Sequence, residues 1–363
     1  MRNRVELKLS SIRLFRYELA LRKPLPGRAG VVRRREGVLV ALEAEGHVGW
    51  GDAAPIPGVS AEGIEQAAGE LLEAAALLKG SRCLAGEEVV FENADLSSFC
   101  TSVRFALETA ALGAAAHLEA KDLAGFIWEE PRGELIVNAL VGGDAKNCVA
   151  EARAAVEAGF SCLKLKVGGD PQLAARTIGE VRRAVGPLIG LRLDANRVWP
   201  LEEACRFACL VSEYRIEYLE EPARDWEGVL NLVEQGRFPL SVALDETLSE
   251  FTVESLYTLP TDVTLVLKPT VLGFTRALQF AKKAEAFGIA VVVSACFESS
   301  VGLSALAALA SGCNSKREVP MGLATGLYLS DDVTSMPLLP RRGRLEVRDC
   351  EVELERLRPF DHE

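Results

Sequence analysis

The chain has 363 residues, of which 49% are hydrophobic and 26% are charged, and its formal net charge is −11. This length predicts two domains, or one large barrel with a smaller domain. The acidic balance disfavours a nucleic acid or an anionic membrane as partner, because both require a positive surface, whereas a small anionic substrate can still bind in a locally cationic cleft.

The nine cysteines and three histidines show neither a disulfide framework nor a zinc pattern. The cysteine count is odd and no CxxC pair occurs, so we expect reduced thiols and a cytoplasmic protein. The start of the chain alternates polar and apolar residues, so no signal peptide is expected. No stretch reaches the length of a membrane span, and no oligomeric state is predicted.

Residues 1–130 predict a compact α+β domain in which strands precede helices. Alternating or short apolar runs predict three strands: residues 5–9, 37–42 and 48–51. Residues 22–30 are rich in Pro, Gly and Arg, which predicts a loop. Residues 62–78 and 101–120 are rich in Ala, Glu and Leu, which predicts helices.

Residues 131–340 predict a (β/α) barrel, because short apolar runs alternate with helical stretches. The runs are residues 135–140, 162–167, 189–194, 216–220, 241–245, 264–268 and 290–294. Their continuous apolar character is typical of parallel strands covered on both faces, and seven consecutive units favour a closed barrel. The eighth strand position, residues 319–323, is short and irregular, and the tail 341–363 is expected to return to the first domain.

Five of these strands end in a charged residue, at intervals of 23 to 28 residues: Lys166, Asp194, Glu220, Asp245 and Lys268. The carboxyl ends of barrel strands converge on the face that holds the active site, so these side chains are expected to meet. Three neighbouring carboxylates repel one another unless a cation joins them, and Mg²⁺ prefers oxygen ligands. A single acid after a strand is more often a helix cap, but three on successive strands favour a metal site.

Lys164 and Lys166 lie on the same side of one strand, because side chains alternate. A lysine inside a barrel is costly unless it has a partner or a task. Lys166 is placed to act as a base beside the cation of Lys164, and Lys268 faces it from four strands along the ring. Two lysines on opposite sides of a bound carboxylate reach both faces of the adjacent carbon. The competing interpretation is an exposed strand with solvated amines.

These residues lie in motifs that resemble those of the enolase superfamily, muconate-lactonizing subgroup, over nearly the whole chain. The motifs are Lys164-Leu165-Lys166, Asp194-Ala195-Asn196, Glu220-Glu221-Pro222, Leu244-Asp245-Glu246 and Val266-Leu267-Lys268-Pro269. Within the subgroup, Trp199, Leu272-Gly273 and the segment 294–302 are most similar to the o-succinylbenzoate synthase family. The resemblance implies a (β/α)7β TIM-like barrel with an N-terminal α+β capping domain.

The resemblance also implies a chemistry. Three carboxylates would bind Mg²⁺ (or Mn²⁺): Asp194, Glu220 and Asp245. Lys166 would remove the proton next to a substrate carboxylate, Lys268 would stabilise the intermediate, and Lys164 would tune Lys166. The implied reaction is the syn dehydration of 2-succinyl-6-hydroxy-2,4-cyclohexadiene-1-carboxylate in menaquinone biosynthesis, so the expected partner is a small-molecule carboxylate.

Supporting residues follow from the same resemblance. Three residues beside the ligands would orient them: Asn196, Glu221 and Glu246. Three residues after the seventh and eighth strands would receive the rest of the substrate: Ser294, Ser299 and Gly322. Turn chemistry explains the last three residue types equally well. Residues 23–30 match the position of the capping-domain loop that closes over substrate in the family.

Two other functions stay open. A dipeptide epimerase or an N-succinylamino acid racemase would use the same pair of lysines, so the motifs do not fully separate these activities from the dehydratase. A catalytically silent barrel that serves as a binding protein is the third hypothesis. Such a protein would show no response to Mg²⁺.

Overall fold

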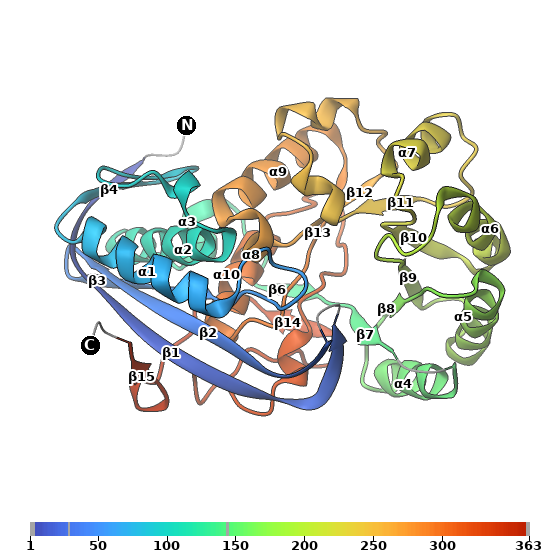
Figure 1. Ribbon diagram of the computed structural model, residues 1–363, viewed down its shortest axis with the longest axis horizontal. Helices are drawn as coiled ribbons and strands as arrows, with labels where there is room; N and C mark the ends of the chain where they lie inside the picture. The colour runs from blue at the N-terminus through green and yellow to red at the C-terminus, as the bar shows by residue number, and fades with distance from the viewer. Residues whose placement is uncertain (1–3, 28–29, 143–144, 361–363) are drawn as a thin grey trace.

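The computed structural model describes residues 4–27, 30–142 and 145–360. Figure 1 shows an N-terminal sheet with two long helices on one side, placed beside a ring of parallel strands that is surrounded by further helices. Among the described residues, none of the helices combines the length and the apolar content that a membrane-crossing helix needs. All nine cysteines are free thiols.

The N-terminal sheet has six antiparallel strands in the order β3-β2-β1-β4-β5, with β15 added beside β1. The strands are β1 (Val5–Gly27), β2 (Gly30–Ala44), β3 (His47–Ala53), β4 (Arg82–Ala85), β5 (Val89–Phe91) and β15 (Arg358–Pro359). Helices α1 (Ile64–Leu78) and α2 (Thr101–Leu118) pack on this sheet, close to the bounds that the sequence predicts. Gly49 and Gly51 let β3 lie directly on α2, since a Cβ at either position would come within 1.9 Å of a helix carbonyl oxygen.

The predicted loop at residues 22–30 is wrong for most of its length, because β1 continues to Gly27 and β2 begins at Gly30. The register of the two strands shifts between Ala20 and Leu25. A shift of this kind accommodates Pro24, which cannot donate to a ladder. Residues 28–29, at the tip of the predicted loop, lie outside the described residues.

Seven parallel strands form the second sheet, in the order β13-β12-β11-β10-β9-β8-β7. They are β7 (Ala139–Val141), β8 (Cys162–Lys166), β9 (Gly190–Asp194), β10 (Ile216–Glu220), β11 (Val242–Leu244), β12 (Thr264–Leu267) and β13 (Ala290–Val293). Helices connect successive strands on the outside of the ring: α4 (Ala145–Glu157), α5 (Pro171–Val185), α6 (Leu201–Val211), α7 (Trp226–Glu234), α8 (Pro269–Leu272), α9 (Phe274–Phe287) and α10 (Ser300–Ser311).

A short segment closes the ring between the edge strands β13 and β7. The amide of Gly322 donates to the carbonyl of Val293 (2.8 Å), and the amide of Asn138 donates to the carbonyl of Met321 (2.9 Å). The eighth position is therefore filled by single bridges instead of a regular strand, in agreement with its irregular sequence. The predicted (β/α)7β barrel with an N-terminal α+β capping domain is confirmed.

The predicted strand at residues 135–140 is divided in two. Its first half forms β6 (Glu134–Ile136), which pairs antiparallel with β14 (Arg344–Glu346), and only its second half overlaps β7. The amide of Val137, between them, donates to the carbonyl of Gly343 (2.9 Å). The remaining elements are α3 (Leu123–Ile127) and the 3-10 helices Leu96–Ser98, Ser212–Tyr214, Glu246–Ser249, Glu254–Thr258, Thr325–Tyr328 and Leu354–Arg356.

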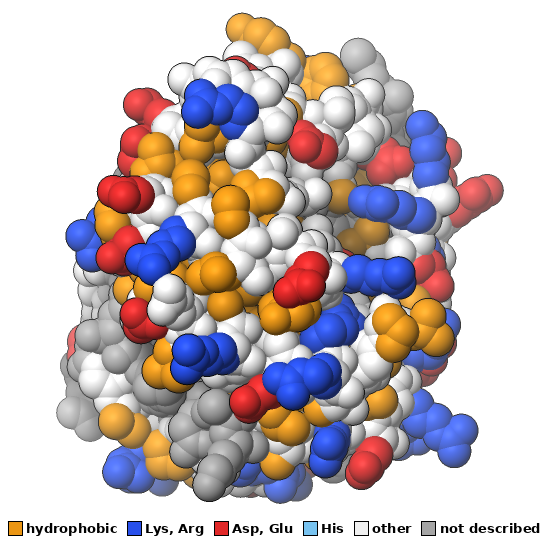
Figure 2. Space-filling model, turned by 90° about the vertical axis from the view of Figure 1, so that its right-hand side faces the viewer, with side chains coloured by type: hydrophobic (Ala, Val, Ile, Leu, Met, Phe, Trp, Pro, Cys, Tyr) orange, Lys and Arg blue, Asp and Glu red, His pale blue; other side chains and the backbone are white. Residues whose placement is uncertain are grey.

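The outer surface of the barrel carries mixed charge. Figure 2 shows the side of the molecule that lies at the right of Figure 1, where α4 to α7 are found. Among the side chains that this view colours, lysine and arginine are interspersed with aspartate and glutamate, without a continuous basic surface. Such a distribution does not favour binding of a polyanion to this face.

His117 joins helix α2 to the C-terminal tail. Its Nδ1 lies 2.8 Å from the carbonyl oxygen of Val48, and its Nε2 lies 3.4 Å from a carboxylate oxygen of Asp349. Both partners can only accept hydrogen bonds, so the pair is complete only when both ring nitrogens are protonated. The bond to Asp349 is the largest cause that raises the pKa of His117 above its ordinary value of 6.5.

We expect this pair to stabilise the protein more at lower pH. A raised pKa in the folded state gives stability that is fully present below the unfolded value, and that is lost as pH rises through the folded value. The urea midpoint of wild type should therefore exceed that of His117→Gln more at about pH 6 than at about pH 8. A difference that stays constant over this range would contradict the protonated pair.

Candidate active site

The structure brings the charged strand ends together at the carboxyl end of the barrel. The amine of Lys164 lies 2.6 Å from a carboxylate oxygen of Glu220 and 3.1 Å from one of Asp194. Lys268 donates a hydrogen bond to Asp245. Three of these carboxylates are almost completely buried, with exposed fractions of 2% (Asp194), 0% (Glu220) and 7% (Asp245). Residues from five strands thus form one charged centre in which lysines neutralise the acids.

The backbone after these strands adopts conformations that non-glycine residues disfavour. Asn196 and Arg197 after β9, Glu221 after β10 and Phe297 after β13 have φ values of 44°, 56°, 43° and 61°. A left-handed residue costs about 1–2 kcal/mol, so surrounding contacts must hold each in place. Residues in such conformations cluster at functional sites, and the first three follow strand ends that carry the charged centre, whereas Phe297 follows β13, the strand beside β12.

The charges of the centre shift one another's titration. Burial lowers the pKa of Lys164, but the carboxylates of Asp194 and Glu220 outweigh burial and hold the pKa above its ordinary value. Burial, and next the neighbouring carboxylate of Asp194, raise the pKa of Glu220 well above its ordinary value. Added positive charge at this point would favour the ionised form of Glu220.

A divalent cation fits the chemistry of this centre. The donors are carboxylate oxygens, which Mg²⁺ prefers. In the described part of the chain, Oε2 of Glu220 is buried and has no hydrogen-bond partner, and an unpaired buried oxygen is costly unless it finds a donor or a cation. In the described part of the chain, no three acidic, His or Cys side chains form a group that could hold a metal ion as they stand. The oxygens of these carboxylates contact the amines of Lys164 and Lys268 instead.

Lys166 differs from the other two lysines. Its side chain is exposed at the end of β8, in register with Asp194 on β9. Its amine makes no hydrogen bond and no ion pair to other described residues, whereas Lys164 and Lys268 are both bonded to carboxylates. Among the described contacts, Lys166 is therefore the one of these three lysines whose amine no carboxylate engages.

The three residues predicted to orient the ligands lie beside the centre. Glu221 accepts hydrogen bonds from the amides of Asp245 (2.7 Å) and Thr247 (2.8 Å). The side-chain amide of Asn196 donates to Glu246 (3.4 Å). Burial, and next the charge of Asp245, raise the pKa of Glu246. Glu221 thus holds the backbone that carries one predicted ligand, and the orienting roles stay predictions.

Two of the three residues predicted to bind the rest of the substrate lie side by side, and the third bonds to the N-terminal domain. Ser294 and Gly322 are bridged to each other where the barrel closes, and a Cβ on Gly322 would lie 2.8 Å from Oγ of Ser294. The hydroxyl of Ser299 instead donates to Asp52 of the N-terminal sheet (2.7 Å), and Ser299 is completely buried. In this structure that hydroxyl serves the contact between the domains, so a substrate contact by Ser299 stays a prediction.

Comparison with known proteins connects this geometry to a family. The family described as "Enolase C-terminal domain-like" matches residues 147–351, and the family described as "MenC, N-terminal domain" matches residues 9–113. The first match covers the barrel from α4 onward and more than half of the chain. The chain belongs to the enolase superfamily. Members of this superfamily are enzymes, so the chain is an enzyme.

Curated relatives and solved structures agree with this membership. The o-succinylbenzoate synthase of Haemophilus influenzae is 30% identical over 306 residues, which cover 83% of this chain and 85% of that protein. Protein PHYLLO of Arabidopsis thaliana is 34% identical over 340 residues, which cover 82% of this chain but 20% of that much longer protein. The D-Ala-D/L-Ala epimerase of Cytophaga hutchinsonii is 26% identical, with 93% of each chain covered.

A solved structure shows the same fold at lower identity. A dipeptide epimerase from Enterococcus faecalis, in complex with Mg and the dipeptide L-Leu-L-Tyr, superimposes with a TM-score of 0.82. The match covers 94% of this chain and 98% of the epimerase, at 20% identity. The superfamily fold therefore extends over both domains of this chain.

Sequence reasoning missed the residues that join the domains of this superfamily member. Arg35 is 1% exposed, and its guanidinium donates to the carbonyls of Ala54 (2.7 Å), Pro55 (3.0 Å) and Phe297 (3.3 Å). It thus ties the N-terminal domain to the segment after β13. The only local signal was a run of arginines at residues 33–35, which is typical of a solvated surface.

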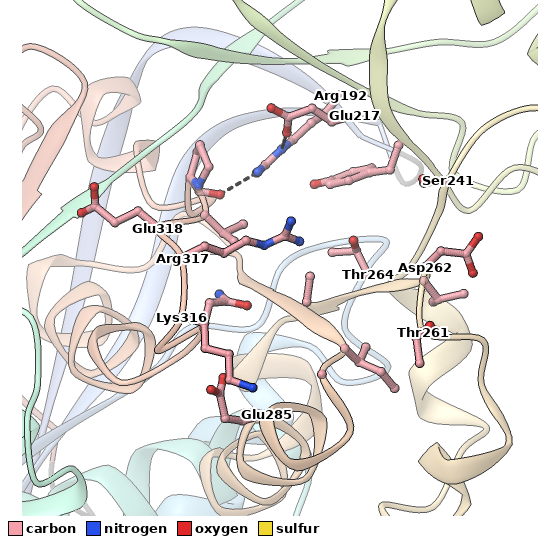
Figure 3. A pocket seen from close by; sticks show the side chains of 18 residues that line it. Arg192, Glu217, Ser241, Thr261, Asp262, Thr264, Glu285, Lys316, Arg317 and Glu318 are labelled. Atoms are coloured by element: carbon pink, nitrogen blue, oxygen red, sulfur yellow. Dashed lines mark hydrogen bonds and ion pairs between the residues drawn. The ribbon is translucent and has the colours of Figure 1, made fainter.

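A cavity of about 670 Å³ lies at the other end of the barrel, where the strands begin. Figure 3 shows Arg317 reaching into this space, whereas Asp262 and Glu318 point toward its margins. On its wall, Arg192 pairs with Glu217 (2.7 Å). None of the charged strand-end residues lines this cavity. It is therefore separate from the candidate active site of the superfamily member.

Proposed function

We propose that this enolase superfamily enzyme is an o-succinylbenzoate synthase, a carbon–oxygen lyase that dehydrates 2-succinyl-6-hydroxy-2,4-cyclohexadiene-1-carboxylate in menaquinone biosynthesis. The observation that carries the proposal is the match of residues 9–113 to the MenC N-terminal domain, in front of a barrel with lysines and carboxylates at its strand ends. The 30% identity to the Haemophilus enzyme over both domains supports it.

Asp194, Glu220 and Asp245 would hold Mg²⁺. When bound, Mg²⁺ supplies positive charge beside the substrate carboxylate and so lowers the cost of the negative charge that develops on deprotonation. Lys164 would stay close to two of the ligands, since its amine already contacts Glu220 and Asp194.

Lys166 would act first as the base and then as the acid of the reaction. Its amine takes the proton from the carbon next to the carboxylate, and the electron pair of that C–H bond becomes available to form a new double bond. The ammonium of Lys166 then gives the proton to the departing hydroxyl group as the C–O bond breaks, so water leaves. One group on one face of the ring serves both steps, which accounts for a syn elimination.

Lys268 would act as a fixed cation on the other face. Burial lowers the pKa of Lys268, but Asp245 and the other acidic groups around it together outweigh burial and keep the pKa well above its ordinary value. A permanently charged ammonium stabilises negative charge, or lies over a π face, without exchanging a proton.

The dehydration can be followed directly by absorbance. We expect the purified protein to remove the ultraviolet band of the cyclohexadiene substrate in the presence of Mg²⁺ and to stop when EDTA is added. If a folded protein that binds Mg²⁺ leaves this band unchanged, the proposed dehydration is wrong. The proposed metal site would not be contradicted by that result.

The second candidate is epimerisation of a dipeptide or racemisation of an N-succinylamino acid. The similarity to the Cytophaga epimerase, which covers 93% of both chains, favours it, and lysines on two faces suit a reaction that removes and returns a proton. Deuterium uptake at the α-carbon of a dipeptide, without loss of the diene band, would favour this activity over the dehydration.

A further inference from the structure

Arg197 lies at the centre of a polar network behind the carboxylates. Its Nε donates to Glu221 (2.6 Å), its Nη1 donates to Glu250 (3.0 Å), and its Nη2 donates to the hydroxyl of Thr247. The side chain is 22% exposed, whereas that of Glu221 is 1% exposed. The guanidinium therefore provides the positive charge that a buried carboxylate requires.

Glu221 links Arg197 to Asp245, one of the predicted metal ligands. One of its oxygens accepts from the amides of Asp245 (2.7 Å) and Thr247 (2.8 Å). Its other oxygen accepts from the hydroxyl of Thr247 (2.8 Å) and from Arg197. With all four bonds formed, the carboxylate fixes the backbone at the end of β11, where Asp245 lies.

The same residues join the ends of β9 and β10. The amide of Arg197 donates to the carbonyl of Glu221 (2.9 Å), and the amide of Ala195 donates to the carbonyl of Glu220 (3.0 Å). Both Arg197 and Glu221 have positive φ values, so their backbone is held by contacts instead of by intrinsic preference. The network thus spans the three consecutive strands that carry the three carboxylates.

We propose that Arg197 is a positioning residue for the divalent cation. By holding Glu221, it fixes the backbone of Asp245 relative to Asp194 and Glu220, so that the three carboxylates converge on one ion. Arg197 touches neither the ion nor the substrate. The inference rests on the proposed metal site, and it adds a residue outside the charged centre on which the affinity of that site depends.

The test is the affinity for Mg²⁺ alone, measured by titration calorimetry on the full chain. Arg197→Met keeps the apolar part of the side chain and removes the guanidinium group. We expect it to weaken Mg²⁺ binding by about 10–100-fold, the usual effect of losing a residue that supports a metal ligand. Arg197→Lys keeps the charge and should recover part of this loss. Folding of each variant is checked by circular dichroism.

Arg182→Met is the matched control. Arg182 also donates to several backbone groups, among them the carbonyls of Tyr214 (2.8 Å), Gly186 (2.6 Å) and Ile189 (2.7 Å), but it lies in the last turn of α5, away from the carboxyl ends of the strands. The Arg182→Met variant should be less stable than the wild type and should keep the wild-type affinity for Mg²⁺. An effect on affinity as large as that of Arg197→Met would show general loosening of the barrel and overturn the proposal.

A double-variant cycle tests the route through Glu221. If Arg197 acts through this carboxylate, Glu221→Gln and Arg197→Met should each weaken Mg²⁺ binding, and the double variant should lose much less than the product of the two effects. Wild-type affinity in folded Arg197→Met would overturn this inference and leave the proposed metal site intact. Failure of the wild-type chain to bind Mg²⁺ would overturn the metal site on which both proposals rest.

Discussion

Lys166→Ala is expected to lower kcat by at least about a thousandfold, since a group that serves as both base and acid contributes about 10²–10⁴-fold in a single role. Mg²⁺ affinity and folding should be preserved. The side chain of Lys166 is exposed and bonded to no other described residue, and surface substitutions of this kind change the free energy of unfolding by only about 0.5 kcal/mol.

The measurement is single-turnover loss of the diene absorbance, together with calorimetric titration of Mg²⁺. Lys8→Ala, which removes an exposed lysine of the N-terminal sheet, should retain full turnover. Wild-type turnover in Lys166→Ala would mean that another group removes the proton.

Asp194→Asn is expected to abolish the response to Mg²⁺. Asparagine keeps the size of the side chain but removes one of three negative charges, and it offers a single carbonyl oxygen as ligand. Mg²⁺ at about a hundred times its Kd should raise the free energy of unfolding of the wild type by about 2.7 kcal/mol. The variant should show no such increase.

Thermal unfolding with Mg²⁺ and with EDTA measures this response. Asp225→Asn is a matched control, because Asp225 accepts from the amide of Gly228 at the start of α7 and takes no part in the charged centre. It should keep the full Mg²⁺-dependent shift of the midpoint. A normal shift in Asp194→Asn would remove Asp194 from the set of ligands.

The barrel could be predicted from the sequence because each βα unit is local. A buried apolar run, a charged residue at its end and a helix behind it are all visible within about 25 residues. The run 135–140 was misjudged because the chain changes partner at Val137, from β14 to the closing segment. The extended hairpin at residues 22–30 was missed because its pairing depends on a bulge. The domain limits at residues 130 and 340 stay predictions.

The charged centre was also accessible from the sequence, since barrel geometry alone places successive strand ends side by side. The contacts around the charged centre could not be predicted from the sequence. Arg197 and Arg35 are charged residues whose partners come from other strands or from the other domain, and nothing in their local sequence distinguishes them from solvated side chains. The hydrogen bond from the hydroxyl of Ser299 could not be predicted for the same reason, because its partner, Asp52, lies in the other domain.

The bond between Asp52 and Ser299 bears on how this chain can change over evolution. Asp52 is completely buried, and it accepts from the hydroxyl of Tyr17 (2.8 Å) and from both the amide (3.0 Å) and the hydroxyl (2.7 Å) of Ser299. Exchanging the barrel for that of a relative would remove the two hydrogen bonds from Ser299 and leave Tyr17 as the remaining donor to this buried carboxylate, at a cost of about 1–3 kcal/mol unless the new barrel supplied an equivalent donor. A substitution on either side of this contact therefore alters the hydrogen bonding of the other domain.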